Sequence, residues 1–239
     1  MALPPLVFDL KRAPPGRMSA PRIVGASIEA GISQSGLSSA VDISGGGFVA
    51  IKYSNVQLSN AGATQLKYWS QLRGQLVGGV RQITVPFLID FMQPRPAIGY
   101  DYADFACTDG LTTTDGFGTT DMRPLTTCAG ALALNAGQVT FSYPTSVAIT
   151  GGEWFDLLHA TKGYRSYEIT DVISSSVVGS NTSYVVAIRP TIREITASGA
   201  VMNFERPRCN MRLEPGTDMP FDIESAWVSR PEVSFIEAF

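Results

Sequence analysis

One stretch of this chain, from Ser59 to Met92, contains both its clearest helix pattern and its clearest strand pattern. In the first half, large apolar residues recur at three- and four-residue steps, which places them on one face of a helix. The glycines at 78–79 favour a helix end, because glycine readily adopts the left-handed conformation that closes a helix. We expect a helix over residues 60–77, with Ser59 or Asn60 as its N-cap. Its core-facing residues are Leu66, Trp69, Leu72 and Leu76.

The second half of the stretch predicts a strand over residues 81–92. Every second residue from Ile83 to Phe91 is apolar, which is the period of one sheet face. Pro86 lies inside this run and has no backbone N–H to donate, so we expect the strand at a sheet edge or at a bulge. The core residues expected on it are Val85, Phe87 and Ile89.

Composition limits the classes of protein that the chain can represent. With 239 residues, of which 44% are hydrophobic, it can form one large β domain or two small ones with a real core. The net charge of −3 provides no basic field for nucleic acid, and we expect no sequence-specific nucleic-acid binding. Only 16% of the residues are charged, which suits a surface covered by copies or partners, although many β-rich monomers are similar.

The N-terminal residues do not resemble a signal peptide, because their charges follow a short apolar run that contains prolines. No apolar stretch is long enough to span a bilayer, so we expect a soluble protein made in a cytoplasm. The three cysteines lack CxxC spacing and argue against a disulfide framework. Cys107 and Cys128 flank one loop, and both a pair and two free thiols stay open.

Between the turn signals, short strand patterns dominate the rest of the chain. They predict a mainly β protein, with a β-sandwich domain that carries the helix and a small inserted β-barrel or sandwich domain. The last strand, near Val233 and Phe235, is expected to dock into the first sheet. The expected parts are an extended N-terminal arm at 1–22, the sandwich at 23–95 plus 216–239, an exposed Gly/Thr/Asp-rich loop at 96–136, and the small domain at 137–215.

The residues that could carry chemistry form no clear catalytic, cofactor or metal motif. His159 has Asp156 three residues before it, but the GxSxG motif of a nucleophile elbow is absent. The acidic loop at 101–121 could hold calcium or line a lumen, yet it lacks EF-hand spacing. Glu153 and Asp156 flank Trp154 and Phe155, a weak signal for a sugar site. We expect no enzyme, no cofactor and no metal.

Five arginines on or beside predicted strands could form ion pairs at an interface, or equally be ordinary surface charges. They are Arg189, Arg193, Arg206, Arg208 and Arg212.

Several segments together resemble a known family. The run WSQLRGQLVGGVRQITVP (Trp69–Pro86) resembles a segment in tail proteins of long-tailed, siphovirus-like bacteriophages and related gene transfer agents. The Asp-Gly repeats at 109–110 and 115–116 resemble the loop that follows there. The run from Tyr164 to Leu213 resembles the second signature, and VSFIEAF resembles the family's final strand. The similarity covers roughly residues 50 to 239 and leaves the N-terminal arm unmatched.

This resemblance implies a distal tail protein, a non-catalytic baseplate component whose β-sandwich domain forms a hexameric ring. In that family the ring joins the tail tube protein to the tail-tip hub protein and to receptor-binding or side-fibre proteins. The expected location is the virion tail tip, with assembly in the cytoplasm of the bacterial host. The alternatives are another tail component (hub, tube or adaptor) and a carbohydrate-binding module. The candidate inter-subunit contacts are Arg73, Pro86, Arg189, Arg193, Arg208 and Phe235.

Overall fold

The computed structural model confirms a mainly β protein, with one helix in the residues that it describes. The chain divides into two compact units. Unit 1 comprises Met1–Val24, Phe48–Leu88 and Cys209–Phe239, and unit 2 comprises Gly25–Gly47 and Ile89–Arg208. The structure describes residues 6–25, 27–32, 38–42, 45–59, 64–89, 92–94, 126–222 and 228–238.

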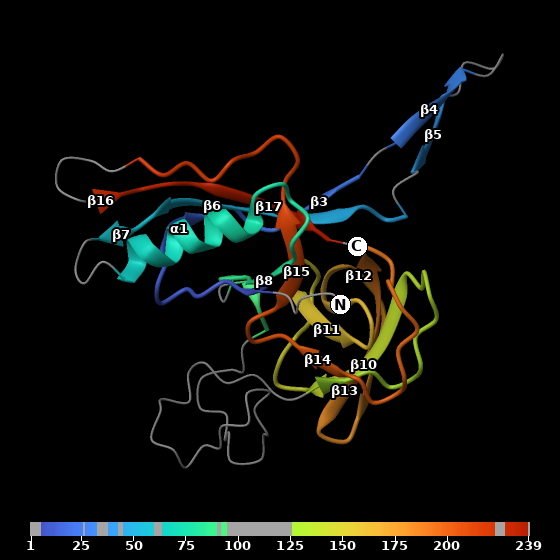
Figure 1. Ribbon diagram of the computed structural model, residues 1–239. Helices are drawn as coiled ribbons and strands as arrows, with labels where there is room; N and C mark the ends of the chain where they lie inside the picture. Colours follow the sequence, from blue (N-terminus) through green and yellow to red (C-terminus); the bar gives the residue numbers. More distant parts are fainter. Residues whose placement is uncertain are drawn as a thin grey trace, which may run out of the picture. The chain divides into compact units, whose positions relative to one another are not determined.

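A seven-stranded sheet forms the framework of unit 1 (Figure 1). Its order is β1-β8-β15-β17-β6-β2, and β3 also pairs with β6. As expected from the sequence, the C-terminal strand β17 lies inside this sheet, between β15 and β6. The strands are β1 (Leu6–Val7), β2 (Pro15–Met18), β3 (Arg22–Val24), β6 (Phe48–Val56), β8 (Ile83–Pro86), β15 (Arg208–Leu213) and β17 (Val233–Glu237).

Aromatic side chains from three distant segments fill the centre of this unit. The antiparallel register pairs Phe235 with Ile51 and Val233 with Tyr53. The rings of Phe8 and Tyr53 lie 5.1 Å apart, and those of Phe8 and Phe235 lie 5.9 Å apart. All three aromatic side chains are buried. Tilted and edge-on aromatic packing of this kind stabilises a core beyond its buried area alone.

The expected N-terminal arm is part of this sheet, at least from residue 6 onward. β6 is nine residues long, so it can pair with β2 near its end, where Arg17 lies opposite Ser54, and with β3 nearer its start, where Arg22 lies opposite Ala50. Pro15 is the first residue of β2, a position that tolerates a missing N–H. The sequence predicted only an extended arm for this segment, whereas its short strands β1, β2 and β3 pair within the sheet.

The strand expected over 81–92 is shorter than predicted and is not at the sheet edge. β8 covers Ile83–Pro86, with β1 paired on one side and β15 on the other. The parallel partner β1 closes the edge, with Leu6 opposite Ile83. Pro86 ends the strand, and its carbonyl accepts a hydrogen bond from the Tyr53 hydroxyl. Val85, Phe87 and Ile89 are all fully buried. The prediction that they lie in the core is therefore confirmed, although the strand ends at Pro86.

The single described helix, α1, runs from Thr64 to Leu76 and buries Trp69, Leu72 and Leu76, whereas Leu66 is only half-buried. The Trp69 indole N–H donates to the Pro220 carbonyl at 3.3 Å. Ser59 does not act as the N-cap, because the helix starts later; instead its N–H and hydroxyl donate to the Gln65 side chain. Asn60 lies outside the described residues. The helix ends at two glycines with positive φ, as the sequence predicts.

Unit 2 contains a six-stranded sheet that curls into a nearly closed barrel (Figure 1). Its order is β10-β13-β12-β11-β14-β9, and a bridge from Cys128 to Phe141 brings the two ends of the order together. Val139, Phe141 and Tyr143 alternate into its core, as predicted. The strands are β9 (Thr126–Thr127), β10 (Gln138–Pro144), β11 (Trp154–His159), β12 (Gly163–Val178), β13 (Asn181–Arg189) and β14 (Val201–Asn203).

The boundaries between the parts differ from the expected ones. The run 209–213, expected in the small domain, belongs to β15 in the sheet of unit 1, where Leu213 lies opposite Phe235. β4 (Ser27–Ile32) and β5 (Ser38–Asp42), expected in the sandwich, pair only with each other among the described strands. A second small pair joins β7 (Leu58–Ser59) to β16 (Val228–Ser229). Alternation alone identifies strands but cannot show which sheet they join.

We predict that Trp69→Ala lowers the free energy of unfolding by about 3–5 kcal/mol, because truncating a buried aromatic leaves a cavity. Chemical denaturation of the purified chain measures the change. Lys67→Ala, at an exposed position of the same helix, is the matched control and should change the stability by less than about 0.5 kcal/mol. Equal stability of the two variants would show that α1 packs nothing essential.

Candidate functional site

The two faces of β11 separate the residues that looked like a catalytic pair. Side chains alternate along a strand, so residues three apart point to opposite faces. Phe155 and Leu157 belong to the core of the barrel-like sheet, and His159 shares their face. Asp156 points to the other face, together with Leu158. The structure therefore does not bring Asp156 and His159 into one site.

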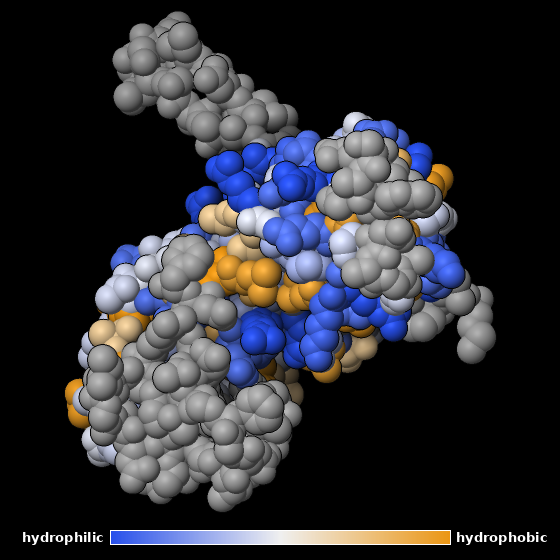
Figure 2. All heavy atoms as spheres, turned by 90° about the vertical axis from the view of Figure 1, so that its left-hand side faces the viewer, coloured by the Kyte–Doolittle hydropathy of each residue, from blue (hydrophilic) through white to orange (hydrophobic). Residues whose placement is uncertain are grey.

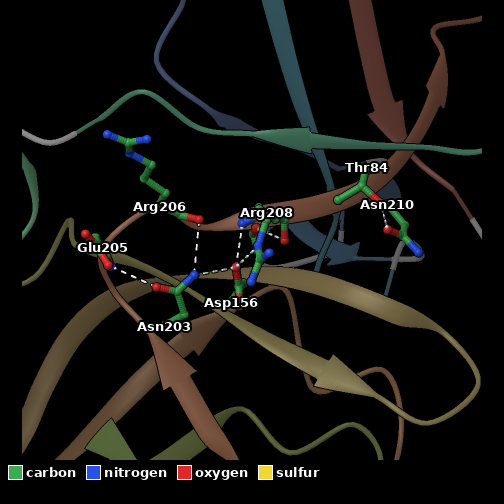
Figure 3. A network of polar contacts seen from close by, with 8 residues as sticks. Thr84, Asp156, Asn203, Glu205, Arg206, Arg208 and Asn210 are labelled. Carbon is green, nitrogen blue, oxygen red and sulfur yellow. Dashed lines mark hydrogen bonds and ion pairs between the residues drawn. The ribbon is translucent and has the colours of Figure 1, made fainter. Parts of the chain in front are cut away.

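On the outer face, Asp156 is the centre of a polar network (Figure 3). Its Oδ2 accepts a hydrogen bond from the Asn203 amide at 3.0 Å and from the Arg208 backbone N–H at 2.7 Å. The Arg208 Nε lies 3.5 Å from the same oxygen. The strand register explains the first contact, because Asp156 lies directly opposite Asn203 in the β11–β14 pair. The carboxylate thus joins β14 to the residue that begins β15.

The same network folds the turn between β14 and β15. The Asn203 amide also donates to the Arg206 carbonyl at 3.1 Å, and its oxygen accepts from the Glu205 N–H at 3.0 Å. Figure 3 shows these contacts converging on Asn203 beside Asp156. From β12, the Ser166 hydroxyl donates to the Arg208 carbonyl at 3.0 Å. One carboxylate and one amide therefore fix the path of residues 203–208.

A small hollow of about 200 Å³ lies over this network. The Arg208 guanidinium stacks on the Tyr164 ring, with 4.1 Å between its Cζ and the ring centroid. Leu158 lies opposite Tyr164 in the β11–β12 register, and 60% of its surface is exposed. An arginine, an aromatic ring and exposed aliphatic side chains are a combination enriched where proteins contact one another. The residues that line the hollow are Asp156, Leu158, Tyr164, Val201, Asn203 and Arg208.

Burial dominates the electrostatics of Asp156. Removal from water raises the pKa of its carboxyl to about 7, although the Arg208 charge and the hydrogen bonds from Arg208 and Asn203 act in the opposite direction. Arg208 is partly exposed, so its attraction is weakened by solvent. Near neutral pH this carboxyl therefore exists in both protonation states.

His159 is a core residue with partners on both ring nitrogens. Its Nε2 lies 2.7 Å from the Tyr167 hydroxyl, and its Nδ1 lies 3.1 Å from the Thr196 hydroxyl. Desolvation lowers the pKa of the imidazole to about 4, so the ring is neutral at physiological pH. Held between two hydroxyls inside the barrel-like sheet, it acts as a structural connector between β11, β12 and the segment after β13.

The residues of the suspected sugar site have structural roles. The Glu153 carboxylate accepts hydrogen bonds from the Thr150 and Gly151 backbone N–H groups, at 2.9 and 2.7 Å, and so holds the turn before β11. Trp154 and Phe155 are both buried. A stacking platform for a sugar needs an exposed aromatic face, and neither side chain offers one.

Arg193, expected at an inter-subunit contact, binds the triple-glycine bend of its own chain. Its guanidinium donates to the carbonyl oxygens of Gly45, at 3.1 Å, and of Gly47. The Thr191 hydroxyl donates to Gly45 at 2.9 Å. Gly46 has φ +94°, and a Cβ there would lie 2.9 Å from the Thr191 nitrogen, so only glycine fits. The glycines that sequence reasoning read as a tight bend are also a docking point within unit 2.

The other candidate contacts have mixed environments. Phe235 is wholly buried against Phe8 and Tyr53, so it cannot reach a neighbouring subunit. Pro86 is half-buried at the end of β8. Arg73 and Arg189 are exposed, and Arg189 lies opposite Glu168 in the β12–β13 register. Figure 2 shows hydrophobic residues gathered in patches among hydrophilic ones on one face of the molecule.

The structure tests the expectation of no metal site only in part. Within the described part of the chain, no group of three or more His, Cys, Asp or Glu side chains could hold a metal ion. The acidic loop at 101–121 and Cys107 lie outside the described residues.

The Cys128 thiol is buried, and desolvation raises its pKa to about 11. No helix in the described ranges has the length and hydropathy needed to cross a membrane.

Comparison with known proteins adds no relatives: neither the family models nor the curated proteins that were searched match this sequence.

Sequence reasoning missed most of the network around Asp156. It singled out Asp156 and Arg208, but for different roles, and it gave none to Tyr164 or Asn203 beyond their strands. The missing signal is the register between strands, since Asn203 and Asp156 lie 47 residues apart and meet only because β11 pairs with β14. Alternation within one strand carries no information about such a partner.

We predict that Asp156 makes the protein less stable as the pH rises from about 4 to 7. Its folded-state pKa of about 7 lies above the ordinary value, so the folded chain binds this proton more tightly than the unfolded chain. The stabilisation that this tighter proton binding gives is complete below about pH 4. Between pH 4 and pH 7, each pH unit lowers the free energy of unfolding by at most about 1.4 kcal/mol. Urea denaturation of wild type and Asp156→Asn across this range measures the effect.

The wild-type stability minus that of Asp156→Asn should decrease with rising pH over this window and then level off. The depressed pKa of His159 acts with the opposite sign, lowering stability as the pH falls from about 6.5 to 4, but it is common to both proteins and cancels. Asp171→Asn, which removes an exposed carboxylate on β12, is the matched control. A difference for Asp156→Asn that does not change with pH would contradict the assignment.

Proposed function

We propose that this protein is a structural virion component, a distal tail (baseplate) ring subunit of a long-tailed bacteriophage or related particle. Its role is mechanical: copies assemble into a ring, expected to be hexameric, that connects the tail tube to the tail-tip hub and to receptor-binding parts. The proposal places it at the tip of the virion tail, after assembly in the host cytoplasm.

The observation that carries this proposal is the order and spacing of the sequence motifs. Trp69–Pro86 resembles the helix-to-strand segment of that family, and Tyr164–Leu213 resembles its second signature. In this chain the first motif spans α1 and β8, and the second spans β12 to β15. Each motif alone is weak, but their order within one chain is the feature that distinguishes this proposal from a general β protein.

The architecture gives physical support. A ring of identical subunits needs two different surfaces on each copy, because the contact is head-to-tail and closes by rotation. The hairpin of β4 and β5 pairs with no other described strand, and an isolated two-stranded hairpin is at best marginally stable in water. Strand edges of this kind suit exchange of backbone hydrogen bonds with a neighbouring chain.

The alternatives have weaker support. A carbohydrate-binding module rested on Trp154 and Phe155, which are buried, and on Glu153, which holds a turn. A hydrolase rested on Asp156 and His159, which lie on opposite faces of β11. Another tail component, such as a hub, tube or adaptor subunit, is the alternative that the sequence resemblance leaves open.

We predict that the purified chain forms hexamers, with a mass of about 150 kDa, six times the 25.6 kDa of one chain. Native mass spectrometry, or light scattering after size-exclusion chromatography, measures this mass. Negative-stain images should show rings with a central opening. A protein that stays monomeric at every concentration would contradict the proposal.

One candidate contact can be tested in the same assay. Arg73→Glu reverses an exposed charge near the end of α1 and should shift the population from rings to smaller species. Lys67→Glu makes the same charge reversal at another exposed position of that helix and is the matched control. Equal masses for the two variants would remove Arg73 from the interface.

A further inference from the structure

Strand β12 is longer than its neighbours and changes partners along its length. Its first part, Gly163–Glu168, pairs with β11, whereas the part from Glu168 to Val178 pairs with β13. The last backbone hydrogen bonds on the β11 side join Ile169 to Gly152 and Glu153, the two residues before β11. Beyond this point the strand keeps β13 on one edge, and no other described strand lies on its second edge.

The final segment of β12, Ser174–Val178, is regular and exposed. Two register shifts precede it, and from Ser174 onward each residue lies opposite one residue of β13. All five residues are exposed, and Val177 and Val178 keep 66% and 67% of their surface in contact with solvent. A Gly179-Ser180 turn connects it to β13, where Asn181 continues the ladder. We call Ser174–Val178 the free edge.

An unprotected strand edge is unusual, because its unpaired N–H and C=O groups are a template for another chain. Proteins commonly block such edges with lysine, proline, an inward-pointing charge or a bulge. The free edge has the sequence SSSVV, which contains no charge and no proline, and both bulges lie before it. Serine and valine side chains leave the backbone accessible, and valine favours the extended conformation.

We propose that the free edge pairs in antiparallel orientation with the free edge of a second copy, around a two-fold axis. A two-fold contact uses the same patch on both copies, so the patch must be self-complementary. An uncharged strand edge meets this condition, since its N–H and C=O groups alternate and two antiparallel copies offer each other donors and acceptors. The occupant is therefore an extended, neutral strand, and the free edge is itself such a strand.

Charge favours this antiparallel arrangement over a parallel one. With the axis at Ser176, each valine lies opposite a serine, Val177 against Ser175 and Val178 against Ser174. The nearest ionisable residue on the strand is Asp171. In this register the two Asp171 carboxylates lie about 30 Å apart along the paired strands, well beyond the range of screened repulsion. A parallel pairing would place them side by side.

This contact is different from the head-to-tail contact of the proposed ring and goes beyond it. It joins two whole particles, a pair of rings if the chain forms rings and a pair of chains if it does not. Five residues bury far less than the roughly 1,000 Å² of a stable interface, so a single contact is weak and depends on concentration. Several such contacts between two rings would act together and strengthen the association.

Sedimentation velocity of the full chain over a wide concentration range tests the pairing. For wild type we expect the mass of the basic species to double as concentration rises. Val177→Lys places a charge on the free edge and should abolish the two-fold increase without changing the basic species. Val80→Lys is the matched control, because Val80 is an equally apolar and even more exposed residue of unit 1, and it should keep the increase.

Circular dichroism checks that each variant is folded, and Ser175→Lys provides a second charge on the same edge. Loss of doubling in both edge variants, with doubling kept in Val80→Lys, supports the pairing. Absence of doubling in wild type, or doubling that survives both edge charges, overturns it. The proposed ring is judged separately, by the mass of the basic species, so either idea can fail without the other.

Discussion

Unit 1 depends on the backbone pairing of β17 with β6. This antiparallel ladder joins the C-terminal part of the chain to a strand almost two hundred residues earlier, and it places Phe235 against Tyr53 and Phe8. β6 also carries β2 and β3 along its second edge. Strands β8 and β15 belong to the same sheet, and most of unit 2 lies between them in the sequence. The fold of unit 1 therefore requires segments from both chain ends and from the middle.

In unit 2, polar side chains fix the geometry that backbone pairing leaves open. Asp156 holds the turn after β14, His159 links two hydroxyls in the core, and the half-buried Arg193 holds the triple-glycine bend. Asp156 and His159 are buried, and each has the specific partners that a polar group in an interior needs. We infer that these residues make unit 2 rigid. This agrees with the proposed role in assembly, because a subunit of an assembly needs a surface of fixed shape.

The sequence predicted local structure well, but it predicted less well which strands pair and which residues meet. The helix near Trp69, the alternation of Val139, Phe141 and Tyr143, and the docked C-terminal strand all follow from periodicity, which depends only on neighbours in the chain. It placed the strand over 81–92 at a sheet edge or at a bulge because of Pro86, but the two-residue strand β1 covers the edge beside β8. Such a short partner leaves no periodic signal. Of the polar network, only Asp156 and Arg208 were singled out, because strand register is invisible in one sequence.

By itself the sequence determined a mainly β chain with one amphipathic helix and an insertion between segments of a first sheet. These properties follow from the spacing of apolar residues, from glycine and proline positions, and from a chain too sparsely charged to stay unfolded. Only the tertiary structure decided which strands are neighbours, that residues 6–24 join the sheet, and that Asp156 and His159 face apart. The reason is physical: side-chain period is a local property, whereas strand pairing is chosen by the whole core, through contacts between residues far apart in the chain.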